Sequence, residues 1–202
     1  MKRVLALVMC LLLCVGSLAG CGAQNTDVLT IGLEADIDNF DPFTNQQNPF
    51  VRIINFNCYE TLFHYDADMK LVMDLATSYE QTDETTYIFH LREGVTFHNG
   101  EPFTAQDVIY TINTIKDEAT GAWRASQYAN VETMTADGDY TLTVKLAAPQ
   151  AGFVDNLAYT AIVSKSTTPK DLTTTPVGTG AYKFVSWTPN DSIKFEKYEG
   201  YR

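Results

Sequence analysis

Residues 87–108 have the sequence YIFHLREGVTFHNGEPFTAQDV, and this stretch carries three structural signals in succession. From residue 86 to residue 91 the side chains alternate as in a β-strand, with Tyr87, Phe89 and Leu91 on one face. Two glycines then permit turns. Thr104 and Asp107 have the spacing of a helix capping box, with Asp in place of Glu, and apolar residues follow at helical spacing. The stretch therefore predicts a strand, a turn region and a helix.

The chain on either side of this stretch predicts further short elements. Residues 128–135 and 140–146 flank Ala136–Asp139 and indicate a β-hairpin, and residues 180–184 and 192–196 indicate another. Helical spacing of apolar residues indicates helices at 49–62 and 150–157. Strands are also expected at 28–33, 62–65 and 78–80, and polar loops at 36–48 and 167–175. The pattern predicts a mixed α/β (α+β) fold.

The amino-terminal residues have the layout of a secretory signal. Lys2 and Arg3 precede an apolar run, and Leu18–Cys21 resembles the lipobox of bacterial lipoproteins. We therefore expect residues 1–20 to be a signal peptide, Cys21 to be lipidated and residues 21–27 to be a tether. The alternative is a transmembrane anchor, but Val4 to Gly20 is short against the ~20 residues needed to span a bilayer.

Cysteine content and charge limit the possible functions. Once residues 1–20 are removed and Cys21 carries lipid, Cys58 is the one remaining thiol, and we expect it to be a small buried hydrophobe rather than a reactive group. The formal charge of −11 becomes −13, because Lys2 and Arg3 leave with the signal and no acid does. Such a charge argues against nucleic acid as a partner.

Sequence motifs for catalysis are missing from this chain. It contains no G-x-S-x-G, phosphate-loop, H-E-x-x-H or C-x-x-C pattern, and Gly178-Thr179-Gly180 lacks the third glycine of a dinucleotide site. His64, His90 and His98 do not have the spacing of metal ligands. We therefore predict no catalytic residue, no metal and no cofactor.

The stretch at 87–108 resembles the signature of the family 5 extracellular solute-binding proteins, which are peptide, oligopeptide and nickel receptors of ABC importers. A second block, Pro176–Phe184 followed by Trp187, is similar to another segment of that family, with Ala181 where proline is usual. The resemblance runs from about Val28 to Arg202. We expect the matching signature residues to have structural roles: Arg92, Gly94, Gly100, Pro102, Asp107, Gly178, Gly180 and Tyr182.

The resemblance implies a type II periplasmic-binding-protein fold for residues 28–202. It further implies that the chain holds the first lobe with a small subdomain at about 62–149, and that it is an amino-terminal fragment without the second lobe. Because such receptors close two lobes over the ligand, half a receptor is expected to bind weakly or not at all.

The resemblance also suggests where a ligand binds. The loop before the first helix resembles a stretch that approaches bound peptide, which makes Gln46, Gln47 and Asn48 candidates; amides stand here where oligopeptide receptors can carry an acid. Trp123 and Tyr128 are further candidates, since aromatics beside Arg124 suit a mostly apolar cleft. The alternative for both aromatics is packing inside the domain.

The expected function is capture of an oligopeptide or similar small solute outside the cytoplasmic membrane and its delivery to ABC permease subunits. Lipid at Cys21 would hold the receptor, a monomer, on the membrane. A nickel or metallophore receptor of the same fold is one alternative, and a lipid-anchored hydrolase or a surface scaffold is an alternative of another class.

Overall fold

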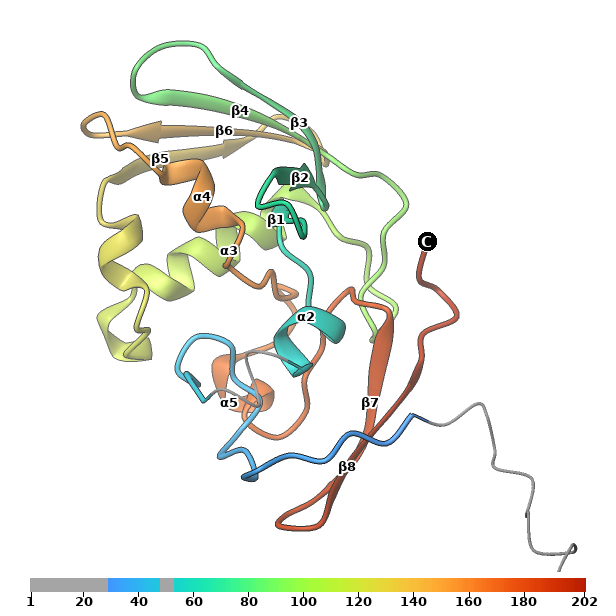
Figure 1. Ribbon diagram of the computed structural model, residues 1–202. Coiled ribbons are helices and arrows are strands. Elements are labelled where there is room, and N and C mark those ends of the chain that lie inside the picture. Colours follow the sequence, from blue (N-terminus) through green and yellow to red (C-terminus); the bar gives the residue numbers. More distant parts are fainter. Residues whose placement is uncertain (1–28, 48–52) are drawn as a thin grey trace, which may run out of the picture. The chain divides into compact units, whose positions relative to one another are not determined.

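A four-stranded antiparallel sheet is the largest sheet of the fold and lies at one end of it, at the top of Figure 1. Its strands are β3 (Ala76–Gln81), β4 (Thr86–Leu91), β6 (Thr141–Leu146) and β5 (Val131–Ala136), in that spatial order. The predicted strand at 86–91 is confirmed, because β4 has these bounds and buries Tyr87, Phe89 and Leu91. The predicted hairpin of β5 and β6 is also confirmed. The structure, a computed structural model, describes residues 29–47 and 53–202.

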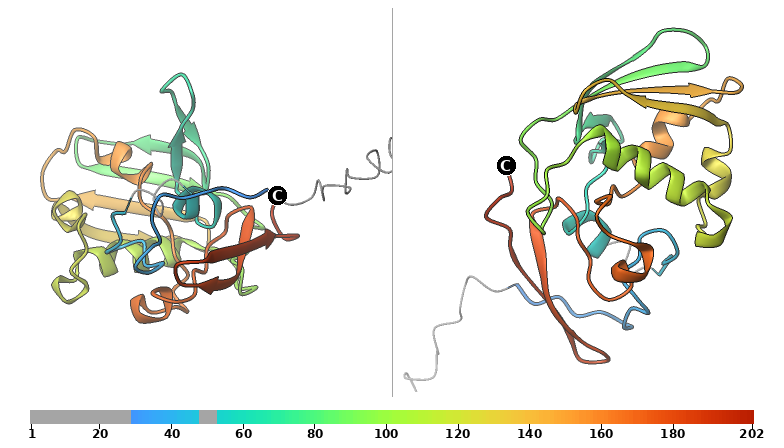
Figure 2. Two further views of the ribbon diagram at one scale, coloured as in Figure 1. Left: turned by 60° about the horizontal axis from the view of Figure 1, so that its bottom comes forward. Right: turned by 180° about the vertical axis from the view of Figure 1, so that it is seen from behind.

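Helix α3 (Ala105–Lys116) begins at Thr104, as the capping box predicts. The apolar side of α3 is buried. Helices α3 and α4 (Phe153–Leu157) lie on the same side of the four-stranded sheet in Figure 1 and in the right panel of Figure 2. Two short 3-10 helices, η2 (Glu118–Thr120) and η3 (Ala125–Tyr128), lead from α3 to β5. The four-stranded sheet is therefore covered on this side by the helices.

Two separate hairpins complete the strands. β1 (Phe63–Tyr65) pairs with β2 (Leu71–Met73), and β7 (Tyr182–Thr188) pairs with β8 (Ser192–Lys197), both antiparallel. The second confirms the predicted hairpin near residue 190, although β7 begins two residues later and ends four residues later than predicted, and β8 ends one residue later. β2 was not predicted, whereas β1 confirms the strand expected at 62–65.

The helix predicted at 49–62 is confirmed only in part, because residues 53–54 are π-helical and 55–57 are α-helical but the helix ends before residue 58. Only α2 (Asn55–Asn57) is α-helical, while residues 59–62 have no helix and residues 49–52 lie outside the described part. The backbone of the following segment bonds to three other parts of the chain, since Gly180 N–H donates to Cys58 O, Ile162 N–H to Glu60 O and Leu75 N–H to Thr61 O. Residues 58–62 are all buried, so this segment carries apolar residues without being a helix.

Smaller departures occur elsewhere. Residues 29–33 carry no strand, and they form a unit separate from Glu34–Arg202. α4 begins later than predicted, after Gly152, and a short helix α5 (Pro169–Leu172) interrupts the loop expected at 167–175. Thr168 and Asp171 cap this helix reciprocally, with the same Thr-x-x-Asp spacing as the capping box of α3.

The predicted signal peptide at 1–20, Cys21, the tether at 21–27 and Asn48 lie outside the described residues. Within residues 29–47 and 53–202, no helix is long and apolar enough to cross a membrane.

Candidate functional site

The two signature blocks of the sequence meet at the buried side chain of His98. The Nε2 atom of His98 lies 2.8 Å from the carbonyl oxygen of Gly180, and its Nδ1 atom lies 3.4 Å from the amide nitrogen of Gly178. A carbonyl oxygen can only accept, so the proton is assigned to Nε2, and Nδ1 accepts from the Gly178 N–H. The backbone N–H of His98 also donates to Gly178 O at 2.8 Å. We call these contacts the His98 clamp.

The glycines of the clamp are required by close backbone contact. A Cβ atom on Gly178 would lie 2.7 Å from the carbonyl carbon of Cys58 and 2.8 Å from the Cα of Tyr59. A Cβ on Gly180 would lie 2.8 Å from the same carbonyl carbon. Only residues without a side chain fit where this segment crosses residues 58–59.

The clamp is a scaffold rather than a reactive centre. Burial lowers the pKa of His98, which favours the neutral ring that the hydrogen bonds require. Burial also raises the pKa of Cys58 to about 12, and this side chain is fully buried. The prediction that Cys58 is a small buried hydrophobe is confirmed.

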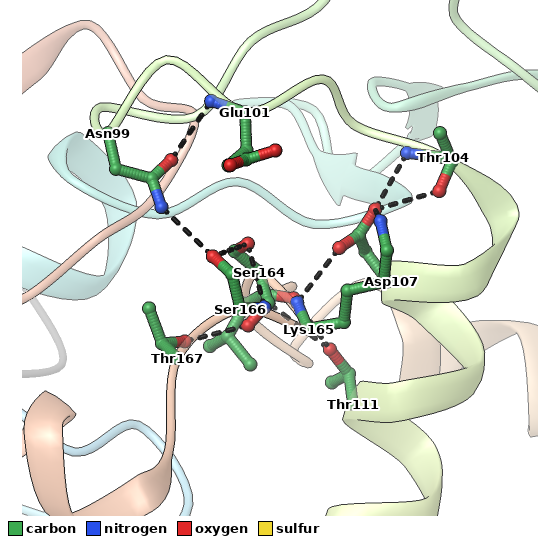
Figure 3. Close-up of polar contacts among 10 residues, drawn as sticks. Asn99, Glu101, Thr104, Asp107, Thr111, Ser164, Lys165, Ser166 and Thr167 are labelled. Carbon is green, nitrogen blue, oxygen red and sulfur yellow. Dashed lines mark hydrogen bonds and ion pairs between the residues drawn. The ribbon is translucent and has the colours of Figure 1, made fainter.

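Asp107 occupies a second buried junction (Figure 3). Its Oδ2 atom accepts hydrogen bonds from the Thr104 N–H at 2.8 Å and the Thr104 hydroxyl at 2.9 Å. Its Oδ1 atom accepts from the Lys165 N–H at 2.9 Å, and the Lys165 ammonium lies 3.5 Å from Oδ2. The start of α3 is thereby joined to the segment around Lys165.

The other signature residues lie in turns or at strand ends. Gly94 and Gly100 have φ angles of 74° and 88°, which favour glycine, and Pro102 forms an isolated bridge with Thr96. Arg92 donates through Nε to the carbonyl oxygen of Asp74 at 2.9 Å. Tyr182 opens β7 and is exposed.

The loop before the first helix lies beside the segment that contains Trp123. The backbone N–H of Trp123 donates to the carbonyl oxygen of Phe43 at 3.3 Å. Gln47 is half-buried, and its Oε1 accepts from the Asp38 N–H at 2.8 Å, whereas Gln46 is exposed. The structure thus brings together the two stretches from which sequence reasoning chose its ligand contacts.

Trp123, Arg124 and Tyr159 form an exposed aromatic face with a cation between its rings. Trp123 is 39% exposed and Tyr159 is 41% exposed. The guanidinium carbon of Arg124 lies 4.0 Å from the centre of the Trp123 ring and 5.7 Å from that of Tyr159. We call these three residues the Arg124 face. Tyr159 was not predicted, because nothing local in its sequence places it beside Trp123.

A small recess borders the Arg124 face and connects it to the loop. It has a volume of about 10 Å³, which is room for about one water molecule, and it is lined by Pro42, Phe43, Ile115, Arg124, Tyr159, Thr160 and Ala161. Arg124 is the one charged side chain in this lining.

Tyr128 does not belong to this exposed face. Its side chain is fully buried, and its hydroxyl lies 2.6 Å from the hydroxyl of Thr160. The expectation of an exposed ligand contact at Tyr128 is therefore wrong, and the alternative of packing holds. The η3 turn directs the ring inward, where it meets Phe153 edge-on at 6.4 Å.

A larger hollow is lined in part by Asp155, the hydrogen-bond partner of Tyr65. The Tyr65 ring lies 5.9 Å from that of Tyr159. The hydroxyl of Tyr65 donates to Asp155, and this hydrogen bond raises the pKa of Tyr65 to about 12. The hollow has a volume of about 380 Å³ and lies between β3, β4 and the segment from Pro149 to Asp155.

The three histidines lie apart from one another. His98 is in the clamp. The Nδ1 atom of His64 lies 3.9 Å from Asp74 Oδ2, and the Nε2 atom of His90 lies 3.6 Å from Glu80 Oε1. In the described part of the chain, no three His, Cys, Asp or Glu side chains gather as metal ligands. None of the histidines lines the recess beside Arg124.

Comparison with known sequences identifies close relatives. The family model of bacterial extracellular solute-binding proteins, family 5 Middle, matches residues 70–202. The glutathione-binding protein GsiB of Pectobacterium atrosepticum is 32% identical over 185 residues, which cover 89% of this chain and 35% of the relative. GsiB of Escherichia coli K12 is 30% identical over 190 residues, covering 91% and 37% of the two chains. The chain thus spans about a third of the length of these relatives.

Comparison with solved structures gives the same fold. NikZ from Campylobacter jejuni, in complex with Ni(L-His), aligns with a TM-score of 0.79 at 25% identity, over 88% of this chain and 37% of that one. The oligopeptide-binding protein AppA from Bacillus subtilis, in complex with a nonapeptide, aligns with a TM-score of 0.74 at 27% identity, over 85% and 36%. The mixed α/β fold is therefore that of part of a type II periplasmic binding protein.

Proposed function

Because this chain belongs to the bacterial extracellular solute-binding proteins of family 5, we propose that it captures a small solute outside the cytoplasmic membrane for an ABC permease. The family model matches residues 70–202, and this observation carries the proposal. An oligopeptide or a similar small molecule is the proposed solute, in keeping with relatives whose names specify glutathione and a nonapeptide. We propose no catalytic role, since these relatives are named as binding proteins.

We propose the Arg124 face and the adjoining loop as the chain's contribution to the ligand site. Trp123 offers an exposed flat ring, and Arg124 is the charged group of the recess. Gln46 and Gln47 supply amides from the loop beside Trp123, and Asn48 completes the proposed set. An apolar wall with a few polar anchors is the usual lining of a small-molecule site.

The second candidate is a receptor for a nickel complex. The likeness to NikZ in complex with Ni(L-His) favours it. A lipid-anchored hydrolase and a surface scaffold receive no comparable support from the relatives.

Ligand-observed NMR with the chain at high concentration tests the function, since it detects weak binding. Glutathione, trialanine and Ni(L-His) are the probes, the last followed by line broadening. We expect saturation transfer to glutathione or trialanine, and we expect Trp123→Ala to remove most of it. Tyr182→Ala, which removes another exposed aromatic, serves as the matched control and keeps the signal. Broadening of Ni(L-His) alone would favour the nickel receptor, and no response to any probe would contradict the proposal that this chain captures a solute by itself.

We further propose a lipid anchor at Cys21, which would hold the receptor on the membrane as a monomer. A single acyl chain holds a protein only marginally, whereas two or more hold it firmly. Expression of the whole chain with labelled palmitate would show incorporation that the Cys21→Ser substitution abolishes. Unchanged incorporation in Cys21→Ser would refute the assignment.

A further inference from the structure

Arg124 is a half-buried cation without a carboxylate partner in the described part of the chain. The ion pairs of residues 34–47 and 53–202 do not include it. Outside the described residues, 48–52 contain no acid and 1–28 contain one, Asp27. Within the described residues, the Arg124 side chain makes one hydrogen bond, from Nη1 to Gln127 Oε1 at 2.8 Å. A guanidinium has five N–H donors, so most of its capacity is left for another acceptor.

The surroundings of Arg124 fix its position without neutralising it. The guanidinium stacks on the Trp123 ring at 4.0 Å, and its carbon lies 5.7 Å from the centre of the Tyr159 ring. Burial lowers the pKa of Arg124, which reflects the loss of water around the charge. A part-buried charge that lacks an opposite charge is unfavourable, and an anion placed beside it removes that cost.

We propose that Arg124 binds a carboxylate of the captured solute, so that the chain selects carboxylate-bearing solutes. This inference rests on the proposed function and names its class of ligand. Among the described residues, Arg124 is the single cation lining the recess, so it balances one negative charge. The planar fork of a guanidinium matches a carboxylate through two parallel hydrogen bonds. The net charge of −11 disfavours solutes with several negative charges.

A pair of probes that differ only at the carboxylate tests the inference. Trialanine and trialanine amide have the same chain, and only the first carries a terminal carboxylate. We expect the wild-type chain to bind trialanine about tenfold or more tightly than the amide in ligand-observed NMR titrations at low salt, as a charge-assisted pair implies. Arg124→Gln should bring trialanine down to the affinity of the amide and change the amide less than twofold.

Two further variants separate charge from geometry. Lys194→Gln removes one positive charge from an exposed site on β8 and should keep the preference for trialanine. Arg124→Lys keeps the charge but loses the fork and the stacked plane, so it should keep only part of the preference. If Arg124→Gln does not fold by circular dichroism, the wild-type comparison and Arg124→Lys decide the question.

The outcomes distinguish the inference from the function on which it rests. Equal binding of trialanine and its amide by the wild type would overturn the carboxylate anchor and leave the function standing. A preference that survives in Arg124→Gln would do the same. Failure of both probes, together with glutathione and Ni(L-His), would overturn the function and the inference with it.

Discussion

Substitution of Gly178 by alanine should destabilise the fold strongly, because this residue touches another part of the backbone. The added Cβ would lie 2.7 Å from the carbonyl carbon of Cys58 and 2.8 Å from the Cα of Tyr59, so the two segments must move apart. Both hydrogen bonds between Gly178 and His98, at 2.8 Å and 3.4 Å, would lengthen with that movement.

The cost can be worked out from these contacts. Forcing a methyl group into a packed region costs about 1–3 kcal/mol, and each weakened hydrogen bond costs about 1 kcal/mol. The expected loss is therefore about 3–5 kcal/mol, against a total stability of about 5–15 kcal/mol for a typical domain. With a urea dependence of about 2 kcal/mol per molar, the midpoint of unfolding should fall by about 2 M.

Urea unfolding followed by tryptophan fluorescence measures this loss. Trp187 packs edge-on against Phe40 at 5.3 Å, so its emission reports on the hairpin that follows the clamp. Gly32→Ala is the control, since a Cβ there meets nothing within 4 Å and its midpoint should not change. A midpoint for Gly178→Ala equal to that of Gly32→Ala would refute the close-contact explanation.

Four further predictions concern buried polar groups. Asp107→Ala should cost about 3–5 kcal/mol in urea unfolding, because it leaves the buried donors of Thr104 and the part-buried N–H of Lys165 without their acceptor. A loss under 1 kcal/mol would contradict this. Tyr128→Phe should cost about 1 kcal/mol by removing the bond to Thr160, with unchanged binding of the probe ligands, and a lost signal would return Tyr128 to the ligand site. With the other cysteines replaced by serine, Cys58 should resist iodoacetamide until urea unfolds the chain, whereas rapid labelling of the folded chain would rule out a buried thiol. Burial lowers the pKa of His98, so the neutral ring stabilises the fold above the unfolded pKa of about 6.5, and this stability is lost as the pH falls below that value. The free energy of unfolding should therefore fall between pH 7.5 and 5.5, and it should fall less in His98→Gln. An equal fall in the wild type and in His98→Gln would exclude His98 as its source.

Elements with local signals were predictable from the sequence. β4 follows from strict alternation, and α3 from the Thr104 and Asp107 pair, because both signals depend on neighbouring residues only. The hairpin of β5 and β6 follows from the turn at Ala136–Asp139 for the same reason.

Elements defined by distant partners were not predictable. The residues after Cys58 have helical spacing but are bonded to Ile162 and Gly180, more than 100 residues away. The Arg124 face likewise depends on Tyr159, which follows 35 residues later and lies near the guanidinium only in the folded chain. Tyr128 was assigned to the surface for a related reason, since a short sequence does not reveal which way a 3-10 turn directs its ring.

The His98 clamp has a consequence for the order in which the chain folds. It joins residue 98 to residues 178–180, and the Gly180 N–H also bonds to residue 58, so none of these contacts is local. Contacts of such long sequence separation form slowly, because the loop between them must be closed first. Until residue 180 has been synthesised, the His98 ring lacks its Gly180 partner and Cys58 its Gly180 donor. We therefore expect a chain emerging from the ribosome to form the four-stranded sheet and α3 early. The contacts of the His98 clamp should form only after residues 178–180 have been synthesised.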